Sequence, residues 1–197
     1  DMLAACNDII NNSPHRLMDD FADVYGWDNT TLSTQVNDEH ILWIDFAGTS
    51  ADGMNTNVQF EYRHGHDFQP RLRDEPKDKS RRPELVAALN ANDHDFGGYG
   101  GASPLPLVAD RSSWDDGDLR YDKTFTKEYE GIPLKFVYCK KLWSLSKTYS
   151  PRGNKSENMV MIRLADIYLM AAEAENELNG PTNAYQYVNK VRERAFE

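Results

Sequence analysis

The feature that most constrains this chain is its C-terminal segment, residues 159–197, which reads as two helices joined by a tight turn. The turn is Asn179-Gly180-Pro181, in which glycine accepts the left-handed cap conformation and proline pre-sets the first turn of the next helix. The first helix carries an apolar arc far wider than the stripe of about 100° that a surface helix needs, so it must contact two or more neighbours. The second helix offers a single stripe, made of Ala184, Val188, Val191 and Ala195.

Two antiparallel helices of this kind are the unit of a helical repeat. One such unit cannot bury its apolar faces alone. The rest of the chain offers few further helices, so we expect partner helices from elsewhere and read the chain as part of a longer protein.

Before this hairpin, the sequence predicts short elements separated by long loops. Residues 1–11 place apolar side chains at helical spacing, and residues 39–47 predict a strand that is covered on both faces. Residues 83–89 predict a short helix with proline at its first position. The strand-like runs 125–129 and 136–143 are separated by a glycine and a proline, which predicts a β-hairpin.

Composition narrows the class of protein. The chain has 197 residues, and its 32 acidic residues against 22 basic ones give a net charge of -10, so nucleic acid is a poor partner. The basic residues between 71 and 82 are interrupted by acidic ones, and we interpret that stretch as a solvated loop. Two cysteines, Cys6 and Cys139, form no spaced pattern and exclude a disulfide framework and a cysteine-rich zinc site. No apolar run reaches the roughly 18 residues of a membrane-spanning helix.

Three loop segments contain residue types that bind metals. Residues 64–67 (HGHD) and 92–95 (NDHD) lack a matched third ligand, so we interpret them as solvated polar loops. Residues 115–118 (DDGD) resemble part of a calcium loop without its terminal glutamate. They are better interpreted as a turn in which aspartate side chains bond the backbone, with a structural calcium ion as the alternative. We therefore predict no cofactor and no metal site.

No motif for catalysis is present. The sequence has no Gly-x-Ser-x-Gly, no phosphate-binding glycine loop and no Cys–His pair, and its many carboxylates do not single out a facing pair for glycoside hydrolysis. We predict that the protein is not an enzyme. Arg163, Glu173 and Arg192 are expected to form an ion-pair network that holds the two C-terminal helices in register.

The C-terminal motifs resemble those of the SusD/RagB family of outer-membrane glycan-binding lipoproteins of Bacteroidetes. The resemblance rests on an Arg-Leu-Ala-acidic helix start, an Ala-Glu-Ala segment and an Asn-x-x-Arg-x-Arg-Ala helix, which here are residues 163–166, 168–174 and 189–195. Three weaker points agree in their order along the chain: residues 9–13, 37–43 and 116–120.

The resemblance implies a mainly α fold in which tetratricopeptide-like helical hairpins scaffold a loop-rich region with a small β-hairpin. Residues 1–158 would form the loop-rich binding region, and residues 159–197 a helical hairpin of the scaffold. Family members are considerably longer than this chain. A signal peptide and a lipidated cysteine are therefore expected outside it, on an outer-membrane, cell-surface lipoprotein.

The family's function is non-catalytic binding of oligosaccharide or polysaccharide and its delivery to a SusC-like TonB-dependent outer-membrane transporter. The alternative is a peptide-binding or protein-interaction scaffold on the same frame, since helical repeats mostly bind protein. Glycan sites combine aromatic faces with a few placed polar groups. The loop residues that fit this pattern are Trp114, Tyr99, Trp27 and Asp115, although a loop tryptophan also often folds back onto its own domain. Trp43 and Trp143 lie in apolar runs and are predicted to be core residues.

Overall fold

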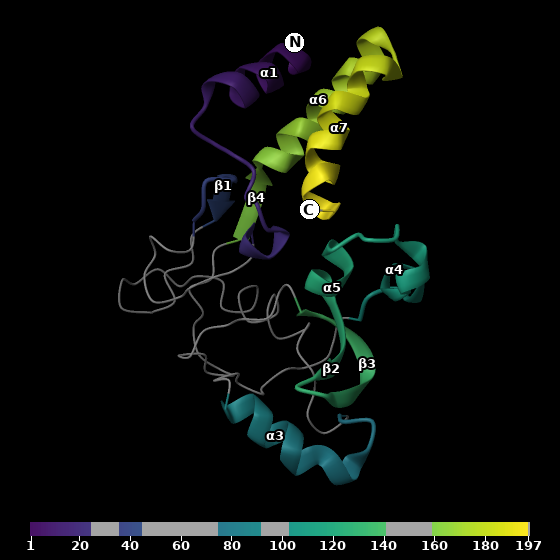
Figure 1. The fold of residues 1–197 in the computed structure, drawn as a ribbon. Helices are drawn as coiled ribbons and strands as arrows, with labels where there is room; N and C mark the ends of the chain where they lie inside the picture. Colours follow the sequence, from purple (N-terminus) through teal and green to yellow (C-terminus); the bar gives the residue numbers. More distant parts are fainter. Residues whose placement is uncertain (25–35, 45–74, 92–102, 141–158, 197) are drawn as a thin grey trace, which may run out of the picture.

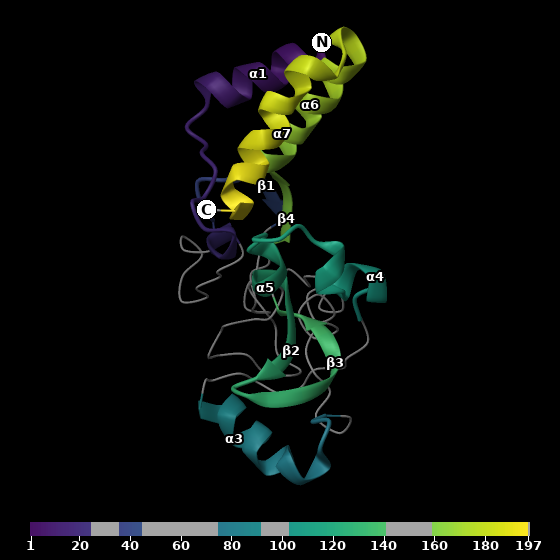
Figure 2. The ribbon, with the colours of Figure 1, turned by 45° about the vertical axis from the view of Figure 1, so that its right-hand side comes forward.

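The computed structural model describes residues 1–24, 36–44, 75–91, 103–140 and 159–196 (Figure 1). Helices dominate this part of the chain, as predicted, and two small antiparallel sheets accompany them. The N-terminal helix and the two C-terminal helices gather at one end of the molecule. A further helix lies at the opposite end, beyond the second sheet, in both Figure 1 and Figure 2.

The C-terminal hairpin consists of α6 (Leu164–Asn179) and α7 (Pro181–Phe196), and α1 (Met2–Asn12) packs on α6. The predicted turn is confirmed: Gly180 has a φ of 86°, and its N–H donates to the carbonyl of Asn176 over 3.0 Å. The single stripe predicted for α7 faces α6, with Ala184 and Ala195 buried. The core between these three helices contains Cys6, Leu164, Ile167 and Ala171.

The first C-terminal helix starts later than the sequence indicated. Residues Met159–Arg163 form strand β4 instead of its first turns, and β4 pairs with β1 (His40–Ile44) in an antiparallel sheet. Arg163 has extended backbone angles and is the N-cap of α6, where its N–H donates to the carboxylate of Asp166 over 2.9 Å. The apolar run of residues 159–162 is compatible with a helix or a strand, and its pairing with β1 stabilises the strand.

Strand β1 confirms the predicted strand, but its predicted burial on both faces is wrong. Leu42 is 52% exposed and Ile44 is 45% exposed, while Trp43 is only partly buried rather than a core residue. The reason is that β1 lies in a sheet of two strands, so α6 and α1 cover Ile41 on one face and leave the other face open.

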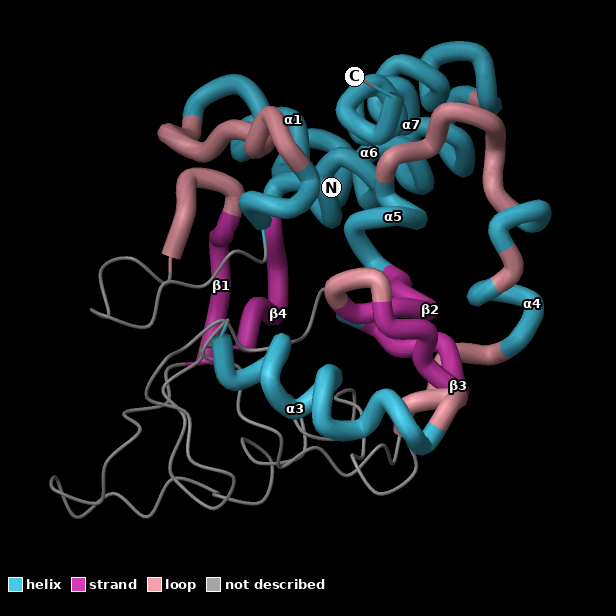
Figure 3. Tube along the Cα trace, turned by 60° about the horizontal axis from the view of Figure 1, so that its bottom comes forward, coloured by secondary structure: helices cyan, strands magenta, loops and turns pink. Residues whose placement is uncertain are grey.

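The predicted β-hairpin is confirmed as β2 (Phe125–Tyr129) and β3 (Ile132–Cys139). Glu130 and Gly131 connect the strands with φ values of 48° and 73°, the backbone that a two-residue hairpin turn requires. Helix α3 (Arg82–Ala91) packs on this hairpin, as Figure 3 shows. Together they bury a second core: Leu85, Leu89, Tyr129, Ile132, Leu134 and Tyr138.

Short helices connect the two ends of the molecule. A 3₁₀ turn, Phe21–Val24, follows α1, and another, Lys79–Arg81, precedes α3. Three more short helices precede β2 in the chain. They are α4 (Pro106–Ala109), the 3₁₀ turn Arg111–Ser113 and α5 (Arg120–Thr124). No helix in the described ranges is both long and apolar enough to cross a bilayer.

A buried ion cluster joins β1, β4 and α7. The carboxylate of Glu39 is fully buried, and its Oε1 accepts from Arg163 Nη1 over 2.8 Å. Its Oε2 accepts from Arg194 Nη1 and from the backbone N–H of Met18. The predicted network within the hairpin is therefore wrong: Arg163 pairs with Glu39, which directly precedes β1, and Arg192 pairs with Asp115 outside the hairpin over 2.8 Å. Both arginines use carboxylates from distant parts of the chain, whereas Glu173 is exposed on α6.

Candidate functional site

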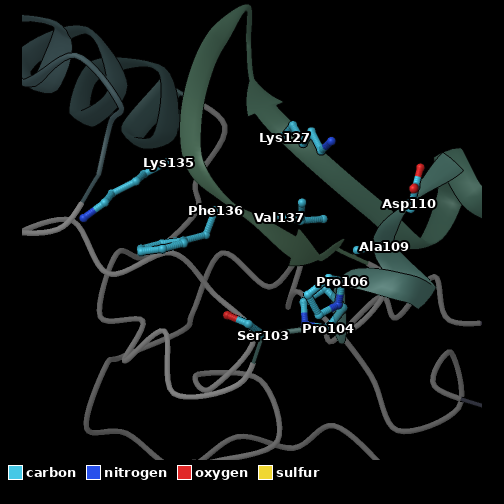
Figure 4. Close-up of a pocket in the computed structure, with 9 residues that line it drawn as sticks. All are labelled: Ser103, Pro104, Pro106, Ala109, Asp110, Lys127, Lys135, Phe136 and Val137. Carbon is cyan, nitrogen blue, oxygen red and sulfur yellow. The ribbon is translucent and has the colours of Figure 1, made fainter.

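An open hollow of about 730 Å³ lies between the β2–β3 hairpin and the segment 103–110, which contains α4 (Figure 4). Its lining combines a phenylalanine ring, two prolines and small apolar groups with a hydroxyl, a carboxylate and two ammonium groups. The residues are Ser103, Pro104, Pro106, Ala109, Asp110, Lys127, Lys135, Phe136 and Val137. Apolar surface with a few convergent polar groups is the usual composition of a ligand site.

The hairpin wall of the hollow is shaped by a bulge in β3. Thr126 faces Tyr138 and Glu128 faces Pro133, so Lys127 alone on β2 lies opposite residues 134–137 of β3. Bulges re-aim side chains and are frequent beside binding sites. Here the bulge directs the ring of Phe136, which is 45% exposed, toward the hollow, and Lys135 Nζ lies 4.9 Å from its centroid.

The bulge is held by Glu75, whose carboxylate is fully buried. Glu75 accepts hydrogen bonds from the backbone N–H groups of Lys135 and Phe136 and, over 2.8 Å, from the hydroxyl of Tyr138. The interpretation of residues 71–82 as a solvated loop is therefore wrong at Glu75. Amides that the bulge removes from the strand ladder need an acceptor, and this side chain supplies it.

The opposite wall is fixed by two aromatic side chains behind it. Trp114 Nε1 donates to the carbonyl of Val108 over 2.8 Å, and the hydroxyl of Tyr121 donates to the carbonyl of Ala109 over 2.7 Å. The Trp114 ring packs edge-on against Tyr121 and Phe125, with centroids 5.8 and 6.0 Å away. Trp114 is thus partly buried, supports the wall through Val108, and is not among the residues that line the hollow.

The other predicted contact residues are placed as follows. Asp115 is exposed, next to Trp114 in the chain, and its carboxylate pairs with Arg192. Tyr99 and Trp27 lie outside the described residues, as does Trp143. Trp114 and Asp115 are consecutive in the chain, neither lines the hollow, and all four ligand contacts stay predictions.

The structure describes only one of the three segments that contain residue types able to bind metals. Residues 64–67 and 92–95 lie outside the described residues. In residues 115–118, the Asp118 carboxylate accepts from the backbone N–H of Arg120 over 3.0 Å, which is the predicted aspartate turn. The Arg120 guanidinium also bonds this carboxylate and lowers the pKa of Asp118. Within the described ranges, no three His, Cys, Asp or Glu side chains are grouped so that they could hold a metal ion.

The charges of the hollow are distributed unevenly. Asp110 Oδ1 accepts from the backbone N–H of Ser112 over 3.0 Å. This bond, the Ser112 side chain and the nearby Lys127 lower the pKa of Asp110, so it is ionised near neutral pH. Lys127 and Lys135 are exposed, and neither forms an ion pair with any other residue that the structure describes.

Sequence reasoning missed Phe136 and Lys135 as site residues, because Phe136 begins the predicted strand 136–143 and Lys135 directly precedes it. One signal was present. Ile132 and Leu134 alternate with polar neighbours, but residues 136–139 (FVYC) are continuously apolar, so the period of two breaks where the bulge occurs. Nothing in the sequence indicated that Glu75, within a charged loop, would be the acceptor for these amides.

The fold and the hollow define a helical scaffold that carries a β-hairpin with a ligand-sized depression. Residues 111–197 match the model of the SusD family. The chain is also 44% identical to SusD-like protein P25 of Formosa agariphila, in an alignment that covers 98% of this chain and 38% of the relative's length. The chain belongs to the SusD family, and it spans well under half the length of this curated relative.

Solved structures share the fold over 98% of this chain. Surface glycan-binding protein A of Bacteroides uniformis matches with a TM-score of 0.65 and 20% identity, over 36% of that protein. Surface glycan-binding protein A of Bacteroides thetaiotaomicron, solved in complex with laminarihexaose, matches with a TM-score of 0.66 and 17% identity, over 42% of that protein. At these identities the likeness establishes the fold, and the ligand has to be argued from the site.

Proposed function

We propose that this protein binds oligosaccharide or polysaccharide without catalysing its cleavage. The observation that carries the proposal is the open hollow with the exposed ring of Phe136 beside hydrogen-bonding side chains. A sugar ring presents C–H surface that stacks on an aromatic face, and hydroxyls that bond to groups such as Ser103 and Asp110. The glycan complex of a structural relative supports the same class of ligand.

We further propose Trp114, Tyr99, Trp27 and Asp115 as ligand contacts. Tyr99 precedes Ser103 by a few positions in the chain, so its segment leads into the lining of the hollow. Trp114 uses its indole N–H internally, and any contact with a sugar is through the exposed part of its ring. Asp115 is exposed and still has acceptor capacity beyond its pair with Arg192.

A glycan array on the full-length protein, followed by isothermal titration calorimetry, tests the proposal. Phe136→Ala and Tyr99→Ala are expected to weaken binding about tenfold each, which corresponds to about 1.4 kcal/mol and lies within the range of an aromatic contact. Trp114→Phe keeps a ring in the aromatic cluster but removes the bond to Val108, and the melting temperature of each variant separates binding from folding. Binding to no glycan on the array would refute the proposal.

We also propose the cellular role that the family suggests. The protein would be an outer-membrane, cell-surface lipoprotein that delivers its glycan to a SusC-like TonB-dependent transporter. Membership of the SusD family supports this role. The test is co-purification: the full-length protein, extracted from outer membranes in mild detergent, should bring the transporter with it. Recovery of the protein in the soluble fraction, without the transporter, would contradict this role.

A second candidate function, a peptide-binding or protein-interaction scaffold, is favoured by two leucines beside the hollow. Leu105 is 72% exposed and Leu107 is 75% exposed, and apolar side chains that protrude together often mark a protein contact. This function predicts that a Leu105→Ser/Leu107→Ser variant loses a protein or peptide ligand. It also predicts that the parent protein gives no signal on the glycan array.

A further inference from the structure

The two lysines of the hollow differ from most cationic side chains of the described ranges. Arg16, Arg120 and Lys123, for example, each pair with a carboxylate of the protein within 3.1 Å. Lys127 and Lys135 have no such partner among the described residues, although acidic residues outnumber basic ones in this chain. Lys135 instead lies over the Phe136 ring and Lys127 acts electrostatically on Asp110, so neither lysine is held in a close ion pair by the described residues.

The lining of the hollow carries these two ammonium groups against the single carboxylate of Asp110. That carboxylate is itself engaged by Ser112, at the α4 side of the hollow. Among the residues that line the hollow, the two ammonium groups thus outnumber the carboxylate, on a molecule with a net charge of -10. A ligand with negative charges is attracted there and is repelled by much of the remaining surface.

The positions of the lysines suit a ligand that also stacks. Figure 4 shows Lys135 beside Phe136, and Lys127 above Val137 on the neighbouring strand. Lys135 Nζ lies over the Phe136 ring at 4.9 Å from its centroid, so this ammonium group borders the surface on which a sugar ring would stack. Lys127, from β2, would meet a second negative substituent farther along the ligand.

We propose that the hollow is a subsite for an anionic saccharide, in which Phe136 stacks on a sugar ring and Lys135 and Lys127 bind its carboxylate or sulfate groups. The proposal rests on the proposed function and narrows it from glycans in general to acidic ones. Carboxylates of uronic acids and sulfate esters share the chemistry that the ammonium groups recognise, and the experiment separates the two sources.

Calorimetry on the full-length protein should compare three probes of similar length: an oligogalacturonate, a sulfated carrageenan oligosaccharide and neutral laminarihexaose. At least one acidic probe should bind more tightly than laminarihexaose, and raising the salt concentration should weaken that binding, since exposed charges are screened. Comparing the affinity for the oligogalacturonate with that for the carrageenan oligosaccharide shows whether the site prefers carboxylate or sulfate groups.

A set of lysine variants assigns the effect to the hollow. The double variant Lys127→Gln/Lys135→Gln is expected to weaken binding of the acidic probe about tenfold, the value for two exposed ion pairs. Lys190→Gln on α7, where Lys190 pairs with Glu193, removes a positive charge far from the hollow in the chain and should leave the affinity unchanged. Far-ultraviolet circular dichroism checks that every variant is folded.

The outcomes separate this inference from the proposed function. Tighter binding of laminarihexaose than of either acidic probe would overturn the acidic subsite and leave glycan binding intact. Acidic binding that the double lysine variant does not weaken would place the site elsewhere and overturn the assignment. Binding of acidic peptides with no binding of any oligosaccharide would overturn both.

Discussion

Two glutamates are fully buried among the residues that the structure describes, and each is stabilised in a different way. Glu39 lies between the guanidinium groups of Arg163 and Arg194. Glu75 instead accepts from two backbone N–H groups and from Tyr138. A buried carboxylate is tolerated only when its oxygens are bonded, so each glutamate ties together the segments that supply its donors.

Removing the charge of Glu39 should destabilise the helical end of the molecule strongly. Glu39→Gln leaves two arginines, Arg163 and Arg194, without their carboxylate, and breaking a buried ion pair from one side costs about 3–5 kcal/mol. The adjacent Asp38→Asn is the matched control, because the Asp38–Arg16 pair is exposed and such pairs contribute about 0–1 kcal/mol. Urea denaturation measures both, and equal losses in the two variants would contradict the prediction.

His40 gives the fold a pH dependence. Burial lowers the pKa of His40 from its ordinary value of 6.5. The neutral ring fits its site, because Nε2 lies 3.0 Å from the carbonyl of Val24 and Nδ1 faces the N–H of Asn37 over 3.4 Å. A lowered folded-state pKa means that the unfolded chain binds the proton more tightly.

The contribution of His40 to stability is therefore complete above pH 6.5 and is lost as the pH falls below 6.5 toward the folded-state pKa. Urea midpoints measured from pH 7.5 down to pH 5 should fall in the wild type, and His40→Gln should show a shallower dependence. An identical slope in the two proteins would show that another group is responsible.

At the scale of elements, the β3 bulge links the second core to the hollow. Leu134 and Tyr138 on either side of it are buried against α3, whereas Phe136 between them points outward. Without an acceptor at Glu75, the amides of the bulge would have to rejoin the ladder or meet water. The position of the Phe136 ring thus depends on a residue far away in the sequence.

Glu75→Gln tests this dependence. A glutamine can accept at one oxygen only, so one of the N–H groups of Lys135 and Phe136 loses its bond, at a cost of about 1–3 kcal/mol. Amide hydrogen exchange at these two residues should accelerate, with weaker glycan binding. Tyr138→Phe is the control, since it removes the hydroxyl bond but leaves both amides bonded. Unchanged exchange at residues 135 and 136 would refute the role of Glu75.

At the scale of the whole molecule, two separate cores divide the described residues. One joins α1, α6 and α7, and the other joins α3 to the β2–β3 hairpin. They are linked where the N–H of Leu119 donates to the carbonyl of Ala195 over 2.8 Å, at the end of α7. Among the described residues, the two ends are therefore joined at a turn rather than through a shared core.

Two cores predict two units of local stability. Leu89→Ala creates a cavity in the hairpin core, and Ile167→Ala creates one in the helical core, at about 2–5 kcal/mol each. Hydrogen exchange should then accelerate mainly in β2 and β3 for the first variant and mainly in α6 and α7 for the second. Uniform acceleration throughout the chain in both variants would show a single cooperative unit instead.

Much of this fold could be predicted from local sequence patterns. The Asn-Gly-Pro turn, the apolar stripe of α7 and the β2–β3 hairpin depend on neighbouring residues, and the structure confirms them. Strand β4 and the bulge could not be predicted, because strand pairing and amide satisfaction are decided by residues far away in the chain. The candidate site could not be predicted for the same reason. Trp114 was chosen because it lies in a predicted loop, whereas the aromatic ring that lines the hollow is that of Phe136.

The shared carboxylate of Glu39 also has a consequence for protein engineering. The helical hairpin of residues 164–196 looks like a self-contained part that could be moved to another scaffold. However, one of its arginines, Arg194, has its counter-ion at Glu39, directly before β1, and Arg163 at the start of the hairpin uses the same group. A transplanted hairpin would carry these positive charges into an apolar setting. A successful graft must therefore bring strand β1 with it or replace both arginines by apolar residues of similar volume.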